Sequence, residues 1–243
     1  MRNEPDHSAQ DKKTPTILRE VRQALQGQCD SATLDFQKFP NIQNLKLPEI
    51  TEYCKKVENC KKNIPMSVIL PQIPDSISFT AFNKGRLLVN HTGGVLECNL
   101  ALHRFFNCPI IPGSAVKGIA RNAGRFDEDQ ERFARVFGGA KKGKSDQAGS
   151  VAFLMAIPEN NNWKIVPDVL TSHHGSDTKN PTPVFFPAVE SGATFRFTVA
   201  PTARTQDGDL KFAVKCLKAA LAENGAGAKT AAGYGWFKIQ ENA

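Results

Sequence analysis

The sequence predicts an α+β fold, with a ferredoxin-like (RRM-like) β-α-β-β-α-β core, insertions and an N-terminal extension. Three observations predict it. Apolar residues recur at helical spacing over 114–124 and again over 209–224. Strand-like segments stand before, between and after these helices, and residues 193–200 alternate apolar with polar side chains. Without the insertions, the order is strand, helix, strand, strand, helix, strand, which is the ferredoxin-like order.

The chain is expected to divide near residue 76. Residues 1–75 are expected to form the N-terminal extension, disordered over 1–13, and residues 76–243 the domain. Thr14 and Pro15 open a short helix that reaches about residue 26, because proline is favoured in the first turn of a helix. The remainder, residues 27–75, contains five prolines and predicts no element.

Within the domain, a further helix is expected over about 128–137. Asp127 is its expected N-cap, and Gln130 completes a capping box. A strand over 164–171 is interrupted by Pro167. The other expected segments are strands over 77–82, 85–90, 151–157 and 236–240, a basic loop over 140–149 and a polar loop over 175–183.

The segment after the second core helix carries four glycines between positions 225 and 235. Glycine is used where φ is positive or where another chain comes close, and such a run lets main-chain N–H groups surround an anion. Phosphate is the first candidate. A nucleotide-binding P-loop is disfavoured, because Ala228 precedes Lys229 and a helix precedes the loop. The alternative is a surface hairpin that binds nothing.

The start of the first core helix is a second candidate anion site. Pro112 and Gly113 make a turn, and Ser114 is the expected N-cap. Lys117, Arg121 and Arg125 follow at four-residue spacing, so that three like charges stack on one helix face. A polyanion would relieve their repulsion, and the helix start presents N–H groups and a positive dipole end. The alternative is an ordinary solvated basic face.

These two segments together form a pattern shared with a known family. The residues read Ile-Pro-Gly-Ser-x-x-Lys-Gly-x-x-Arg over 111–121 and Gly-x-Gly-x-Lys-Thr-x-x-Gly-Tyr-Gly over 225–235. In this order they resemble the RAMP superfamily of CRISPR effector proteins, the nearest type being the sixth subunit of Cmr (type III-B) complexes. The resemblance covers roughly residues 84–240, with Val136-Phe137-Gly138 and residues 168–174 as further signatures. Ala115 departs from it, since the family more often has a second serine there.

The resemblance implies a non-catalytic subunit that grips the backbone of an RNA without reading its bases. The implied partners are the CRISPR guide RNA and other Cmr or RAMP subunits, with contact to target RNA left open. No cofactor and no metal are expected, and Tyr234 is expected to stack on a base. The residues expected to bind RNA are Gly113, Ser114, Lys117, Arg121, Gly225, Gly227, Lys229, Thr230, Gly233, Tyr234 and Gly235.

Two other functions stay open. Some RAMP relatives cleave RNA, and a metal-independent endoribonuclease needs a general base and acid. His173 and His174 are the best candidates, with Asp168 as a carboxylate, although adjacent residues of a strand point to opposite faces. The other possibility is a protein-binding scaffold whose glycine-rich segment docks on a partner. The basic residues near both segments favour nucleic acid.

Composition supports a polyanionic partner. The formal net charge is +7, which bears on association and not on fold. No apolar run is long enough to span a bilayer, and residues 1–13 do not resemble a secretory signal, so a cytoplasmic protein is expected. The six cysteines form no C-x-x-C pair and are expected to be reduced thiols. A metal cluster of Cys98, His103 and Cys108 is disfavoured by its spacing.

Overall fold

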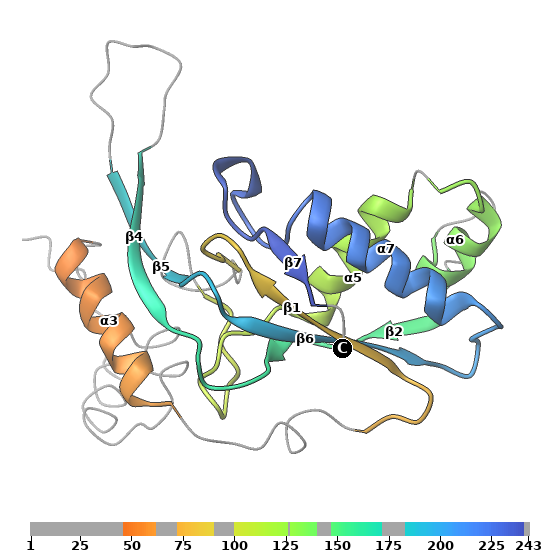
Figure 1. Ribbon diagram of the computed structural model, residues 1–243, viewed down its shortest axis with the longest axis horizontal. Coiled ribbons are helices and arrows are strands. Elements are labelled where there is room, and N and C mark those ends of the chain that lie inside the picture. The colour runs from red at the N-terminus through yellow and green to blue at the C-terminus, as the bar shows by residue number, and fades with distance from the viewer. Residues whose placement is uncertain are drawn as a thin grey trace, which may run out of the picture.

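The computed structural model describes residues 46–61, 72–89, 100–125, 127–139, 147–171 and 183–240. Its mixed helices and antiparallel sheets confirm the predicted α+β class (Figure 1). The helix predicted over 14–26 lies outside the described residues. The elements in chain order are α3 (Leu47–Asn59), β1 (Ile77–Asn83), α5 (Gly113–Gly124), α6 (Gln130–Phe137), β2 (Val151–Phe153), β3 (Ile157–Pro158), β4 (Ile165–Thr171), β5 (Pro183–Val189), β6 (Thr194–Pro201), α7 (Asp209–Glu223), the 3₁₀ turn η1 (Thr230–Ala232) and β7 (Phe237–Ile239).

The main sheet is antiparallel, with strand order β2-β6-β1-β7 and β3 as a further partner of β6. The alternating pattern of β6 turns Phe195, Phe197 and Val199 to a buried face, where each is fully inaccessible. Phe79 of β1 lies opposite Phe197, and their rings stack with centroids 5.5 Å apart. Helices α5 and α7 cover this face (Figure 1). The strands predicted over 77–82 and 193–200 are thus confirmed.

Two predicted strands are wrong in extent. Within residues 85–89, only Leu87 makes a β-bridge, to Val189, because the neighbouring carbonyl groups accept hydrogen bonds from the glycine-rich segment instead. The single strand expected over 151–157 is two short strands, β2 and β3. It breaks because Ala156, between them, pairs with Ile111 and not with β6.

The three helices predicted within the described residues are confirmed, apart from their caps. Helices α5 and α7 match the predicted spans, and Gly225, with φ 72°, follows the end of α7 as expected. Asp127 is not the N-cap of α6. Asp129 is, and its carboxylate accepts the N–H of Arg132 at 2.9 Å. Asp127 instead accepts the N–H of Asp129 and pairs with Lys215, so the helix begins two residues later than predicted.

A buried carboxylate joins α6, α7 and the start of β2. Asp209, fully inaccessible in the first turn of α7, accepts two hydrogen bonds from Arg135 at its Oδ1, including one of 2.9 Å. The hydroxyl of Ser150 donates to Oδ2 at 2.7 Å, and the N–H of Gln206 donates at 3.1 Å. Burial alone would raise the pKa of Asp209, but these donors outweigh it and leave the pKa below its ordinary value.

Strands β4 and β5 form a separate hairpin that projects from the body (Figure 1). Pro167 does not interrupt β4, because it lies where the main chain points away from β5. The N–H groups of β4 that point away from β5 pair with no strand among the described residues. The N–H of Ile165 donates to Glu58 at 3.0 Å, Pro167 has none, and the N–H of Val169 donates to the Asp168 carboxylate. We call Ile165, Pro167 and Val169 the capped edge.

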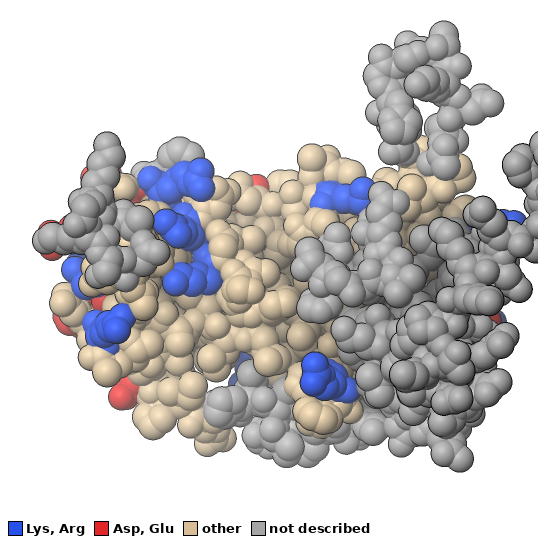
Figure 2. Space-filling model, turned by 180° about the vertical axis from the view of Figure 1, so that it is seen from behind, with Lys and Arg blue, Asp and Glu red and all other residues tan. Residues whose placement is uncertain are grey.

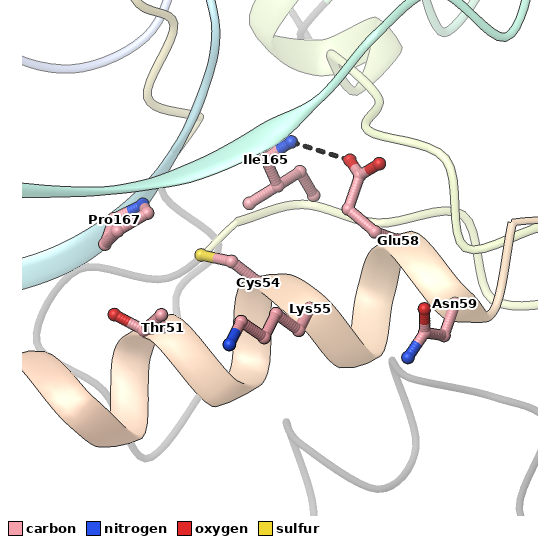
Figure 3. A pocket seen from close by; sticks show the side chains of 7 residues that line it. All are labelled: Thr51, Cys54, Lys55, Glu58, Asn59, Ile165 and Pro167. Atoms are coloured by element: carbon pink, nitrogen blue, oxygen red, sulfur yellow. Dashed lines mark hydrogen bonds between the residues drawn. The ribbon is translucent and has the colours of Figure 1, made fainter.

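Helix α3 packs against this hairpin and was not predicted from the sequence. Ile50, Tyr53, Cys54 and Val57 are buried and join the main hydrophobic core. Between α3 and β4 lies an open groove of about 380 Å³, drawn in Figure 3 with the Glu58–Ile165 hydrogen bond. No helix among the described residues combines the length and apolar character needed to cross a bilayer.

Candidate nucleic-acid interface

The glycine loop, residues 225–235, leaves the end of α7 and runs beside residues 85–88. Its glycines are needed chiefly for contact within the protein. Gly235 has φ 66°, and a Cβ there would lie 1.8 Å from the carbonyl oxygen of Ala226. A Cβ on Gly227 would lie 2.4 Å from the carbonyl oxygen of Leu88. The N–H groups of Gly225 and Gly235 donate to the carbonyl groups of Ala220 and Arg86, so these two N–H groups are not available to an anion.

Donors remain at the tip of the loop. The N–H groups of Gly227, Lys229, Thr230 and Ala231 find no acceptor within the part of the chain that the structure describes. Lys229 has a left-handed backbone with φ 60°, and the 3₁₀ turn η1 follows it directly. Successive N–H groups in such a turn face the same side and make a concavity suited to an anion. The exposed side chain of Lys229 adds a positive charge there.

Tyr234 anchors the loop and is not placed to stack on a base. Its side chain is 8% exposed and its ring lies 6.0 Å from that of Phe186, between centroids. Its hydroxyl donates to Oδ2 of Asp168 at 2.6 Å, and the guanidinium of Arg86 pairs with Oδ1 at 2.7 Å. The predicted stacking role is therefore wrong, because the ring and hydroxyl are both engaged inside the protein.

The charges of this anchor stabilise one another. Burial alone would raise the pKa of Asp168, but the hydrogen bonds from Tyr234, Arg86 and the Val169 N–H outweigh it, and the pKa is lowered. Burial and then the bond to Asp168 raise the pKa of Tyr234 well above its ordinary value. A charged Asp168 and a neutral Tyr234 thus fix β4 to the glycine loop. Sequence reasoning noted Asp168 as a carboxylate but did not identify Arg86.

The start of α5 differs from the prediction by one residue. Pro112 occupies the N-cap position with extended backbone, so Ser114 lies inside the first turn and makes no capping hydrogen bond. Gly113 is the first residue of the helix, and it must be a glycine because a Cβ there would lie 2.3 Å from the carbonyl oxygen of Phe153. The N–H groups of Gly113, Ser114 and Ala115 have no acceptor among the described residues, as expected for a helix start.

Lys117 and Arg121 lie side by side on α5. The ammonium of Lys117 would be 3.2 Å from a Cβ at Gly149, and the guanidinium of Arg121 would be 3.7 Å from one at Gly139. Within the described ranges, neither side chain forms an ion pair, and nor does the exposed Arg125. Figure 2 shows Lys and Arg side chains gathered at the left, over the end of the molecule that holds α5 and α6 in Figure 1.

The start of α5 and the glycine loop lie next to different strands of the main sheet. Gly113 lies against the carbonyl of Phe153 in β2, whereas the glycine loop leads into β7, and these strands are the opposite edges of the four-strand order. Three strand spacings separate the edges, about 14 Å. No hydrogen bond or ion pair joins the two segments in the described part of the chain. The two candidate segments therefore stand at opposite edges of the main sheet and do not form a single cradle.

The catalytic and metal candidates are mostly outside this region. His173, His174, His91, Cys29 and Cys98 lie outside the described residues. His103 stacks on Phe106 with centroids 4.6 Å apart, and burial lowers its pKa. Cys54, Cys108 and Cys216 are buried free thiols, and burial raises the pKa of Cys108 to about 12. Among the described residues, no group of three or more His, Cys, Asp or Glu side chains is placed to hold a metal.

Comparisons with known proteins bear on the fold and the family. A search of the curated proteins finds no match. A chain of the type III-B Cmr-beta complex bound to cognate target RNA, solved by cryo-electron microscopy, is similar at 20% identity and TM-score 0.57, over 99% of this chain and 77% of that one. A chain of a type IV-B CRISPR complex is similar at 14% identity and TM-score 0.50, over 69% and 90%. Cmr6 from Pyrococcus furiosus follows at 20% identity and TM-score 0.46, over 68% and 98%.

The family model of the RAMP superfamily matches residues 88–238, more than half of the sequence. The match begins at the segment that supports the glycine loop and ends in β7, so it contains both candidate anion sites. This chain therefore belongs to the RAMP superfamily.

Proposed function

We propose that this protein is a non-catalytic RNA-binding subunit of a type III-B (Cmr) CRISPR effector complex. It holds the backbone of the guide RNA and contacts neighbouring RAMP subunits. Membership of the RAMP superfamily supports this, as does the shared fold with a chain of a Cmr complex that is bound to target RNA. The formal net charge of +7 favours the same class of partner.

We also infer that the core is ferredoxin-like. The elements β1, α5, β2, β6, α7 and β7 follow the order strand, helix, strand, strand, helix, strand along the chain. In the sheet, the fourth of these strands lies beside the first, then the third, then the second. On this assignment, helix α6, strand β3 and the β4–β5 hairpin are insertions into the core.

The observation that carries the proposal is that main-chain donors lie beside cations that form no ion pair with any described residue. Lys229 lies within the run of unbonded N–H groups at the tip of the glycine loop, and Lys117 lies one turn beyond those at the start of α5. Phosphate groups accept from both kinds of donor, and neither kind distinguishes one base from another. A chain of phosphates can therefore be held at both places without sequence preference.

A non-catalytic role is supported by how the described candidates are engaged. Asp168 and Tyr234 are committed to each other and to Arg86, and His103 is stacked on Phe106. We expect purified protein to leave labelled RNA intact. Cleavage products that disappear in His173→Ala or His174→Ala would instead establish the endoribonuclease.

The binding test combines Lys117→Ala with Arg121→Ala. Affinity for three unrelated single-stranded RNAs, measured by fluorescence anisotropy over a salt series, should fall about equally for all three. The slope of log K against log salt should decrease by about 0.7 for each phosphate that the variant no longer neutralises. The control is Lys211→Ala with Lys238→Ala, which removes the same charge from exposed positions on α7 and β7. Equal slopes for both double variants would refute the interface on α5.

A further inference from the structure

Helix α5 contains a glycine that nothing in the described structure requires. Gly118 lies in the middle of the helix, is exposed, and a Cβ built on it would meet no described atom within 4 Å. Its φ is not positive. Glycine is one of the least favourable residues in a helix interior, because it loses the most backbone entropy on folding. A fold that needs no glycine at this position would be more stable with alanine.

The other two glycines of α5, Gly113 and Gly124, are each required by a close contact within the protein. A Cβ would meet the Phe153 carbonyl oxygen at 2.3 Å from Gly113, and the Cys216 sulfur at 2.9 Å from Gly124. Each of these glycines permits a close approach within the protein. Gly118 would allow an equally close approach to the helix backbone, but no atom of the described chain lies on that side.

The surroundings of Gly118 indicate the chemistry of what approaches. At 100° per residue, one face of α5 carries in succession Lys117, which is half-buried, and Arg121, Ser114, Arg125, Gly118 and Asn122, which are exposed. Three of these six are cations without an ion-pair partner in the described ranges. A protein surface without negative charge, packed here, would bury those charges unpaired, which is strongly unfavourable. A polyanion would neutralise them.

We propose that the sugar-phosphate backbone of bound RNA lies flush on α5 at Gly118, in contact with the bare Cα and main chain. Lys117 and Arg121 then reach phosphates on one side of the contact and Arg125 on the other. This inference rests on the proposed function and adds to it a steric element. The missing side chain sets how closely the RNA approaches, and the cations set the charge.

The test is a series at one position, Gly118→Ala and Gly118→Leu. Both residues are strong helix formers, so both variants should melt about 2–4 °C above the parent protein. Affinity for single-stranded RNA should fall as bulk increases, roughly threefold for Ala and roughly tenfold or more for Leu, on the scale where tenfold in Kd is 1.4 kcal/mol. Higher stability with weaker binding is the result expected of a glycine retained for a ligand.

The control is Ala134→Leu, which adds comparable bulk at an exposed position of α6 and should leave the Kd unchanged. Unchanged RNA affinity in Gly118→Leu, with weaker binding in the Lys117→Ala and Arg121→Ala variant, would overturn the close approach and leave the proposed function standing. Unchanged affinity in both would overturn both. A lower melting temperature in Gly118→Ala would show that the fold itself requires this glycine, which also overturns the inference.

Discussion

Replacing Tyr234 with Phe tests whether this residue anchors the glycine loop or contacts RNA. The change removes only the hydroxyl, which donates to Asp168 at 2.6 Å, and keeps the ring beside Phe186. A buried hydrogen bond to a charged group stabilises a protein by about 1.5–3 kcal/mol. Each 1 kcal/mol shifts the melting temperature of a protein of this size by about 2–4 °C, so we expect a fall of roughly 3–12 °C.

The assay pairs differential scanning fluorimetry with RNA binding by anisotropy. The variant should melt earlier, while its salt slope for RNA stays that of the parent protein, because the hydroxyl faces Asp168 and not solvent. Tyr53→Phe is the matched control, since it removes the hydroxyl of the only other tyrosine, on α3. An unchanged melting temperature together with a tenfold loss of RNA affinity would refute the anchor and restore a direct contact.

Two further predictions concern Asp209, which is buried, and Asp168, which is half-buried. Asp209→Ala leaves Arg135 and Ser150 without their shared acceptor and should lower the free energy of unfolding in urea by about 3 kcal/mol, whereas a loss under 1 kcal/mol would contradict the network. Asp168, whose folded-state pKa is lowered below the ordinary 3.8, contributes stability above that pH and loses it as pH falls through the lowered value. The gap in melting temperature between the parent and Asp168→Asn should therefore narrow below about pH 4, and a constant gap would disprove this.

Elements that depend on local sequence patterns were predicted correctly, whereas contacts between residues far apart in the sequence were not. Helices α5 and α7 were predictable because their apolar spacing is local. Helix α3 was missed because Pro48 looked like a breaker, although it lies in the first turn, where proline is tolerated. The role of Tyr234 could not be predicted, since its partner is 66 residues away in sequence.

The glycine loop shows the same difference between local patterns and long-range contacts. Its departure from helix and strand patterns was visible in the sequence, but the reason for its glycines was not. Gly227 and Gly235 are explained by the carbonyl groups of Leu88 and Ala226, and only folding brings Leu88 to the loop. Gly118 is part of the motif over 111–121, but nothing in the sequence explained a glycine inside a helix, and only the empty space beside it sets it apart from Gly113 and Gly124.

The capped edge of β4 limits how a neighbouring subunit can join the hairpin. The carbonyl groups of a strand from another chain would find no free N–H donor at Ile165, Pro167 or Val169. A β-ladder therefore cannot continue from one protomer to the next along β4. Pro187 removes a further donor on β5, while Val189 is already paired with Leu87. A neighbour that docks along this edge can still donate to its carbonyl groups, but without N–H groups in return it cannot extend the sheet, so its fit depends mainly on the side chains of the hairpin.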